Sequence, residues 1–374
     1  MRKTFFKIHS YLALVALIPL LIVSITGSIL VFKVEIDQWL MPKVAALPYA
    51  QSEKEVPERL NHNILQQHIE GEFPDYILGA WELFNDGHEA DRVYLVKKGT
   101  DDWFKIYFDP FANKVLSEPV NFSHYITDFL LQLHYTFMLN GIGGEHAQWG
   151  TVLGLIAAVI LTLLGITGLV IHRKFWLKLF DLRIRASLRV FSGDFHRLVG
   201  AWSSPIIFIL GITGIYFNAV AIYHELFEHP SEEHYEPTEK LYDSSIDFQQ
   251  LLNDSRVQLD TFTPTYLLYP YEPEVNITVF GHQQRANPFA SNYSSTVTYD
   301  RTNGELLNAF DGRDASAVVK TTDSFRELHF GSFGGLGSKI VWCVVGLSPV
   351  LLGGTGLYIW VFRNRKKKQK GGAH

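Results

Sequence analysis

Four apolar segments constrain this chain more than any other feature of its sequence. They cover residues 8–32, 149–171, 198–222 and 340–362, are 23 to 25 residues long, and contain no Asp, Glu, Lys or Arg. A helix needs about 20 apolar residues to cross the hydrocarbon core of a bilayer. The overall composition, with 47% hydrophobic residues, would suit a soluble protein. The clustering excludes a soluble fold and predicts four membrane-spanning helices.

The positions of the basic residues predict the orientation of these helices. The short segments 1–7, 172–195 and 363–374 hold 15 of the 33 Lys and Arg residues but only two of the 38 acidic residues. Because short cytoplasmic loops are rich in Lys and Arg, we expect both termini and the middle loop in the cytoplasm. Most of the remaining residues, 18 basic and 36 acidic, lie in segments 33–128 and 223–327, which then face outward. An acidic outer surface disfavours nucleic acid as a partner.

The first apolar segment is expected to be a retained helix and not a cleaved signal peptide. It is longer than the ~7–15 residues of a signal-peptide core, and no clear A-x-A cleavage site follows it. Cys343 is the only cysteine, which excludes an intramolecular disulfide, a Cys₄ metal site and covalent c-type haem. Two ordered outer segments without disulfides favour a bacterial inner membrane.

The chain contains an internal duplication. Residues 7–27 read K-I-H-S-Y-L…S-I-T-G and residues 194–214 read D-F-H-R-L-V-G…G-I-T-G, so a histidine precedes a Thr-Gly pair by seventeen residues in both. Leu-His precedes a glycine-rich bend twice, at His134 and at His329, and T-G-L follows within each next apolar segment. Such self-similarity indicates tandem structural repeats. Because each copy crosses the membrane twice, the copies are expected to be parallel.

The two outer segments also repeat each other. Residues 105–116 and 296–307 each read as a β-run, a polar turn that begins at an aspartate, and a second β-run, which is typical of a hairpin. The other predicted elements are strands at 93–97 and 276–280 and short helices at 60–70 and 246–252.

The predicted fold is therefore that of a membrane protein, mainly α-helical. It is a four-helix transmembrane bundle built from a tandem, parallel repeat, with two small α+β domains outside the membrane. In chain order the predicted parts are the first span (8–32), the first outer domain (33–128), an outer-face helix and glycine-rich bend (129–148), the second span (149–171), a basic cytoplasmic loop (172–195), the third span (198–222), the second outer domain (223–327), a glycine-rich bend (328–339), the fourth span (340–362) and a basic cytoplasmic tail (363–374).

Histidines at the helix ends form the candidate cofactor site. His9 and His196 begin parallel helices near the inner face, where His172 also ends the second span. His134 and His329 precede the second and fourth spans, near the outer face. Ionisable groups at membrane depth are costly and suggest a function. Histidine pairs at two depths favour two b-type haems, each held between two imidazoles.

Other cofactors fit the pattern less well. Zinc would need additional Cys or carboxylate ligands, and proton relays usually include Asp or Glu within the bilayer. The spans contain no acidic residue. Several glycines are candidates for close approach to a macrocycle or for helix packing: Gly27, Gly168, Gly200, Gly214 and Gly356.

The other histidines have simpler interpretations. A tract with His224, His229 and His234 resembles a metal site but lacks the H-E-x-x-H spacing. His146 lies close to the start of the second span. The histidines expected to be solvated in polar outer segments are His62, His68, His88, His124 and His282.

In this order, the motifs resemble the PepSY-associated transmembrane family. They include the histidine at a helix start followed by T-G, the D-P-x-x-N/G-x-V/L hairpin, T-G-L-V-I-H-R at residues 167–173 and D-F-H-R-L-V-G at residues 194–200, and they cover nearly the whole chain. The family includes inner-membrane reductases that carry two b haems and release iron from siderophores by reducing Fe(III) to Fe(II). The resemblance implies PepSY-like outer domains, a ferric siderophore as periplasmic partner, and a cytoplasmic or quinol electron donor.

The resemblance also implies roles for individual residues. His134 and His329, at the L-H positions, would be the axial ligands of the outer haem. His196, at the D-x-H position, and its repeat mate His9 would be the ligands of the inner haem, with His172 as an alternative partner. The sequence contains no G-x-G-x-x-G followed by a helix, so no Rossmann site for NAD(P)H or flavin is expected.

Two other classes of function stay open. PepSY modules are better known as inhibitory domains, so the chain could be a membrane-anchored regulator or peptidase inhibitor without a redox cofactor. Parallel repeats and the mid-helix prolines Pro19 and Pro205 are also compatible with a siderophore transporter. Outer-segment aromatic residues are candidates either for a substrate site or for core packing: Trp81, Trp103, Tyr107, Tyr266, Tyr269 and Tyr271.

Overall fold

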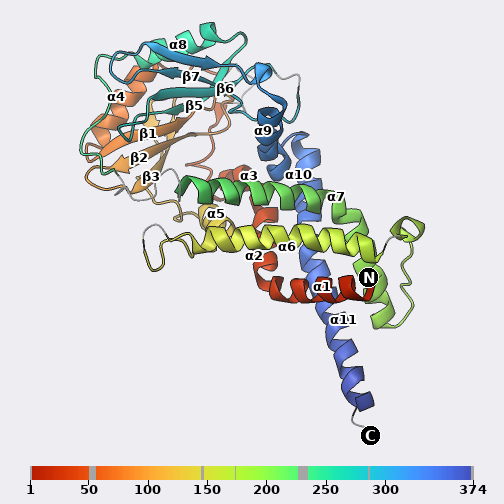
Figure 1. Cartoon of the computed structure of the whole chain (residues 1–374). Helices are drawn as coiled ribbons and strands as arrows, with labels where there is room; N and C mark the ends of the chain where they lie inside the picture. Colours follow the sequence, from red (N-terminus) through yellow and green to blue (C-terminus); the bar gives the residue numbers. More distant parts are fainter. Residues whose placement is uncertain are drawn as a thin grey trace. The chain divides into compact units, whose positions relative to one another are not determined.

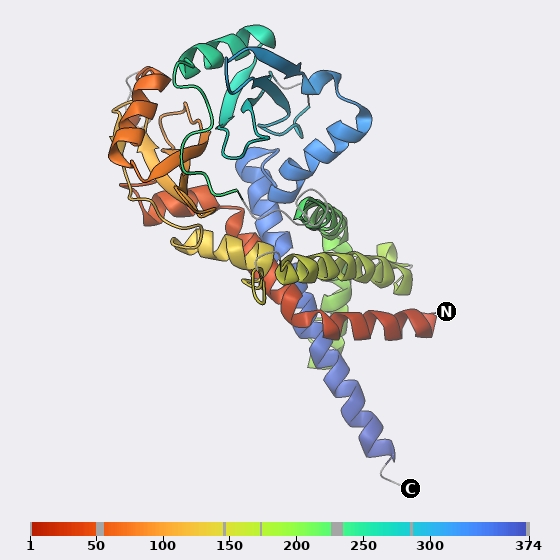
Figure 2. The ribbon, with the colours of Figure 1, turned by 60° about the vertical axis from the view of Figure 1, so that its left-hand side comes forward.

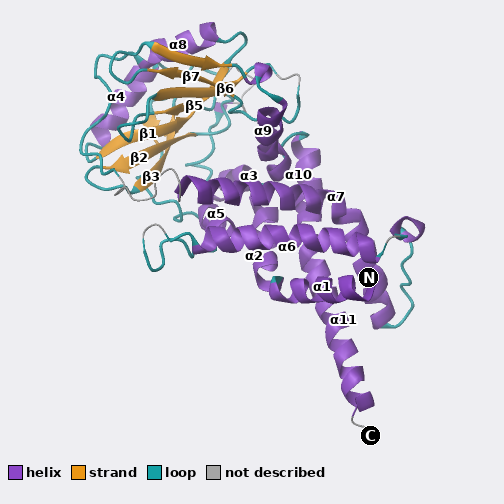
Figure 3. Cartoon of the chain, viewed as in Figure 1, coloured by secondary structure: helices purple, strands orange, loops and turns teal. Residues whose placement is uncertain are grey.

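The chain folds into two compact units (Figure 1). The computed structural model describes residues 2–49, 56–144, 147–172, 174–225, 235–284 and 287–371. The helical unit comprises residues 1–32, 130–230 and 328–374, and the sheet unit comprises residues 33–129 and 231–327. Figure 3 shows the strands in orange, and all of them belong to the sheet unit.

The helical unit contains every apolar segment that the sequence analysis identified. Three described helices are long and apolar enough to cross a membrane: α6 (Trp149–Ile171), α7 (Leu188–Tyr223) and the helical run Gly335–Asn364. A fourth span results if the bent pair α1 (Arg2–Val15) and α2 (Leu17–Leu30) is one crossing. Helices α6 and α7 pack along each other (Figure 1).

The first span is a bent pair and not the single helix that the sequence suggested. Its two parts differ in direction by 66°, and Figure 2 shows this kink in the red N-terminal helix. Pro19 lies in the first turn of α2, where its missing N–H leaves the carbonyl of Val15 without the usual helical partner. The run that contains the fourth span is divided in the same way, into α10 (Gly335–Gly346) and α11 (Ser348–Gly371), with Pro349 just after the break.

The sheet unit corrects the prediction of two separate outer domains. Its eight strands form one antiparallel sheet in the order β4-β3-β2-β1-β5-β6-β7-β8, so each half of the chain contributes four neighbouring strands. The halves are joined where Ala80 and Trp81 of β1 pair with Leu268 and Leu267 of β5. This pairing covers two strand edges that would otherwise expose unpaired N–H and C=O groups. The strands are β1 (Tyr76–Glu82), β2 (Asp91–Lys97), β3 (Trp103–Asp109), β4 (Lys114–Val115), β5 (Thr263–Leu268), β6 (Ile277–His282), β7 (Ser295–Tyr299) and β8 (Leu306–Phe310).

Two helices, one from each half, pack on this sheet. Helices α4 (His62–Glu72) and α8 (Phe248–Gln258) bury Leu65 and Phe248 in a single core with side chains from six of the strands. Their first turns are tied together, because the His62 N–H donates to Gln249 Oε1 over 2.8 Å. The remaining described α-helices are α3 (Lys33–Leu40), α5 (Ile126–Thr136) and α9 (Ala317–Phe330).

His62 is buried, so the expectation that it is solvated is wrong. Its side chain lies in the core where the two helices meet, and its Nε2 is 2.7 Å from the Tyr269 hydroxyl. Burial, assisted by the charge of Arg59, lowers the pKa of His62 from 6.5 to about 3. Burial of His62 is not predictable from the neighbouring residues, because Asn61 and Asn63 on either side are polar.

The buried imidazole makes the stability of the sheet unit dependent on pH. Between pH 6.5 and about 3 the unfolded chain binds a proton that the folded chain rejects. Stability is therefore highest above pH 6.5 and is expected to fall toward pH 3, by up to about 1.4 kcal/mol per pH unit. We expect His62→Gln to flatten this dependence in thermal melts of the full chain followed by tryptophan fluorescence. His68→Gln, on the same helix but partly exposed, should retain it; equal slopes in both variants would contradict the prediction.

Candidate functional site

Four histidines of the helical unit form two pairs. His9 of α1 and His196 of α7 have ring centroids 6.3 Å apart with an interplanar angle of 81°. His134 of α5 and His329 of α9 also have centroids 6.3 Å apart, at 61°. Each pair takes one histidine from each half of the chain. The structure thus brings together the same partners that the repeat suggested.

The spacing within each pair suits two imidazoles on opposite sides of one metal ion. A metal–nitrogen bond is about 2.0–2.1 Å long. The centroid of a five-membered ring with bonds of about 1.33 Å lies about 1.1 Å from each ring atom. Two opposed imidazole ligands should then have centroids about 6.2–6.4 Å apart. Both observed pairs lie in this interval.

A threonine from a neighbouring element positions each of these rings. In every case the threonine belongs to a Thr-Gly pair and lies in the same half of the chain as its histidine. The distances from histidine Nδ1 to threonine Oγ1 are 2.9 Å for His9 and Thr167, 3.0 Å for His134 and Thr26, 2.9 Å for His196 and Thr355, and 2.7 Å for His329 and Thr213.

The two pairs lie at different levels of the helical unit. Helix α7 carries His196 near its beginning, and seventeen residues later it carries Thr213, which contacts His329. At 1.5 Å per residue this separation is about 25 Å along one helix. The hydrocarbon core of a bilayer is about 30 Å thick, so the two pairs have the spacing expected of sites near opposite faces.

His172 occupies a different position from the four paired histidines. It caps the C-terminus of α6, where its N–H donates to the carbonyl of Gly168 over 3.1 Å. His196, and not His172, is the ring neighbour of His9. His172 is still close enough to interact electrostatically with both of those imidazoles.

The other candidate histidines lie at the end of a helix or outside the described residues. His224 caps the C-terminus of α7 through its backbone N–H. His146, His229 and His234 lie outside the described residues. Over the ranges that the structure describes, no group of three or more His, Cys, Asp or Glu side chains is arranged to hold a metal ion. Each histidine pair instead offers two nitrogens, which fits an ion whose other ligands come from a macrocycle.

A further repeated motif lies on the two helices that carry His134 and His329. Both helices contain T-D-x₄-L-H, with Asp128 six residues before His134 and Asp323 six residues before His329. Asp128 is buried and accepts from Lys105 over 2.7 Å and from Lys33 over 2.9 Å. Asp323 accepts from the backbone and the hydroxyl of Ser291. The sequence analysis missed these anchors, although the repeat of Thr-Asp before Leu-His was visible.

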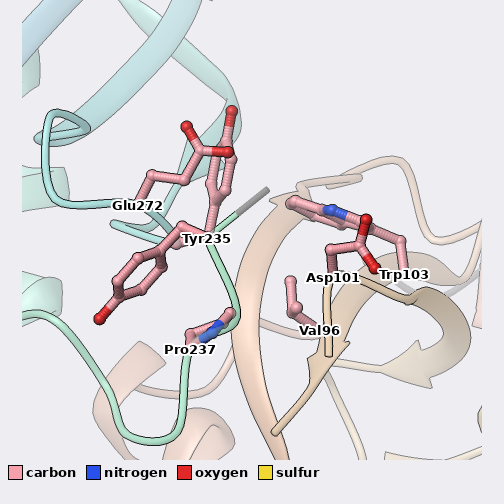
Figure 4. Close-up of a pocket in the computed structure, with 7 residues that line it drawn as sticks. Val96, Asp101, Trp103, Tyr235, Pro237 and Glu272 are labelled. Atoms are coloured by element: carbon pink, nitrogen blue, oxygen red, sulfur yellow. The ribbon is translucent and has the colours of Figure 1, made fainter. Parts of the chain in front are cut away.

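Three of the six candidate aromatic residues pack in the core of the sheet unit. Trp81, Tyr107 and Tyr269 are at most 1% exposed. Trp103 and Tyr271, in contrast, line a pocket of about 240 Å³ within this unit. Figure 4 shows Asp101 and Trp103 on one side of it and Tyr235 and Glu272 on the other. Carboxylates beside aromatic faces are suited to a ligand that carries a positive charge.

Comparison with known proteins agrees with these features. The family model described as PepSY-associated TM region matches residues 6–363. The chain belongs to the PepSY-associated TM family. It is also similar to the uncharacterized protein PA4219 of Pseudomonas aeruginosa, with 25% identity over 259 residues. That similarity spans 63% of this chain and 63% of the relative, which is less than two thirds of its length. Together with the apolar helices, membership of the PepSY-associated TM family makes this a membrane protein that contacts the lipid bilayer.

Proposed function

We propose that this chain is an inner-membrane haem b protein that passes electrons across the membrane and reduces ferric siderophores in the periplasm. The observation that carries the proposal is the presence of two imidazole pairs, each with the spacing of opposed metal ligands, at two levels of the helical unit. A single pair would suit many kinds of metal or structural site. Two pairs about 25 Å apart along α7 suit transfer between the two faces of a bilayer.

The chain's own residues hold and insulate the cofactors in this proposal. His9 and His196 would hold the inner haem, and His134 and His329 the outer one. When bound, haem supplies a reversible one-electron Fe(III)/Fe(II) couple. The apolar spans exclude water and charged side chains from the region between the two levels.

The direction of transfer follows from the charge distribution and the family resemblance. Basic segments at both ends and in the middle loop support a cytoplasmic location of the termini, and hence an electron donor that is cytoplasmic or a membrane quinol. The acceptor is a ferric siderophore, as in the reductases that the motifs resemble. Reduction to Fe(II) weakens its binding to hard oxygen ligands, so the iron can be released.

The pocket of the sheet unit favours a second candidate function. A membrane-anchored regulator of the PepSY type would bind a partner through its outer unit and would need no haem. Asp101 and Glu272, beside Trp103 and Tyr271, give such a unit a place to bind a cationic group.

Purification of the full chain in detergent distinguishes the proposed haem protein from the regulator. The proposal expects a red protein with a bis-histidine b-type spectrum, about two haems per chain, and spectral changes on reduction. In vesicles that contain a reduced quinol, it should deliver Fe(II) from an external ferric siderophore to an Fe(II)-specific dye. A matched variant with alanine at all four paired histidines should do neither. A colourless wild-type protein would overturn the haem proposal and favour the regulator.

A further inference from the structure

The threonines that contact the histidines make hydrogen bonds that leave only one possible direction for the threonine–histidine hydrogen bond. In all four, the threonine hydroxyl donates over 2.7 Å to the backbone carbonyl four residues earlier. A hydroxyl has one proton, so with that proton in use its oxygen can only accept from another group. The proton in the threonine–histidine hydrogen bond must then come from histidine Nδ1.

Backbone carbonyls near the rings favour the same tautomer of the histidines. The backbone carbonyls of Leu164, Val23 and Leu352 also lie close enough to the rings of His9, His134 and His196, respectively, to interact with them electrostatically. Each of these carbonyls lies three residues before the threonine that contacts the same ring. A carbonyl oxygen only accepts, so each of these carbonyls favours a proton on the nearest imidazole nitrogen. With Nδ1 protonated in the neutral ring, the lone pair is on Nε2.

The glycine after the threonine lies beside the imidazole ring in three of the four sites. A Cβ atom at Gly27 would lie 2.8 Å from Cε1 of His134, and one at Gly356 would lie 3.4 Å from Cε1 of His196. At Gly168 the corresponding distance to His9 is 3.6 Å. Gly214 differs, because its Cβ would meet Ala158. At Gly27, therefore, a side chain would displace the imidazole, whereas at Gly168 and Gly356 a Cβ atom would make ordinary contact with the ring.

We propose that Thr26, Thr167, Thr213 and Thr355 are positioning residues that fix the tautomer and the orientation of the four ligand histidines. This inference rests on the proposed function. A hydrogen bond from Nδ1–H makes the opposite nitrogen a stronger donor to a metal, and such outer partners typically change metal affinity by about 10–100-fold. A stronger nitrogen donor stabilises Fe(III) over Fe(II). Each threonine should thus lower the reduction potential of one haem.

Threonine substitutions in the haem-loaded full chain test this assignment. Thr213→Val keeps the side-chain shape but cannot accept the Nδ1 proton. We expect it to raise the potential of the outer haem alone, to change the electron paramagnetic resonance signal of that haem, and to weaken its binding by about 10–100-fold. Thr213→Ser should restore all three properties. Thr26→Val should affect the same haem, because Thr26 contacts the partner ligand His134.

Thr162 provides a matched control within a membrane helix. Its hydroxyl also donates to the carbonyl four residues earlier, over 3.0 Å, but among the described residues it has no hydrogen bond to a histidine. Thr162→Val should leave both potentials unchanged. If Thr213→Val does not fold, Thr26→Val and the serine variants still decide the outcome. Two haems with unchanged potentials and signals in both valine variants would overturn this inference and leave the proposed function intact. A wild-type protein without haem would overturn the proposed function itself.

Discussion

Replacement of His329 by alanine is expected to remove one haem and leave the other in place. Alanine has no nitrogen that could bind a metal ion, so the pair would keep only the imidazole of His134. The other pair, His9 of α1 and His196 of α7, lies on different helices and keeps its own spacing. The haem-to-protein ratio of the purified full chain should therefore fall from about two to about one.

The four single substitutions of a paired histidine by alanine should fall into two classes, one for each histidine pair. His134→Ala should remove the same haem as His329→Ala, and the double variant should lose nothing more. His9→Ala and His196→Ala should remove the other haem. His88→Ala, at an exposed position of the sheet unit, serves as the control and should retain both. Single variants that keep both haems would refute the ligand assignment, and so would single variants that lose both.

The apolar segments were predictable from the sequence, but the breaks in two of them were not. Residues 149–171 form a helix with the expected bounds, since a run of this length without charge has few alternatives. Pro19, Pro205 and Pro349 are all prolines within apolar runs, yet α7 continues through Pro205 while breaks precede the other two. A proline signals a weakened helix, and the packing around it decides whether the helix bends.

The strands that join the two halves were missed for a physical reason. β1 and β5 lie at the centre of the sheet, and five consecutive residues of β1 are buried. Such a strand reads as a short apolar run without the alternation that identifies a half-buried strand. The strands at 93–97 and 276–280, which the sequence did predict, alternate more clearly. Without β1 and β5, each half looked like a separate small domain.

The four candidate ligand histidines were more predictable from the sequence than the threonines that contact them. Duplication singled out His9, His134, His196 and His329, because a repeat preserves residue type and depth together. In the same alignment the Thr-Gly pairs served only to match the two halves, and no contact with the histidines was predicted for them. Their contact with histidine depends on which helices are neighbours, for instance α6 beside α1 at Thr167 and His9. Sequence spacing alone carries no information about that neighbour relation.

Gly150 is expected to be essential for the position of His134. It is the second residue of α6, and its N–H donates to Asn140 Oδ1 over 2.9 Å. A Cβ atom at this glycine would lie 1.6 Å from the carbonyl oxygen of Thr136, the last residue of α5. Because the clash is with backbone, rotation of a side chain cannot relieve it, and α5 must move away from α6. His134 lies two residues before Thr136 and would move with it.

Gly150→Ala should therefore lose the outer haem, keep the inner haem, and melt at a lower temperature. Overpacking of this kind costs about 1–3 kcal/mol and sometimes more. Haem content and thermal unfolding of the full chain measure both effects. Gly193→Ala on α7 is the matched control, since its Cβ would meet nothing within 4 Å and alanine favours a helix by about 1 kcal/mol over glycine. If Gly150→Ala retained both haems and its melting temperature, the close contact of α5 with α6 would not be what holds His134 opposite His329.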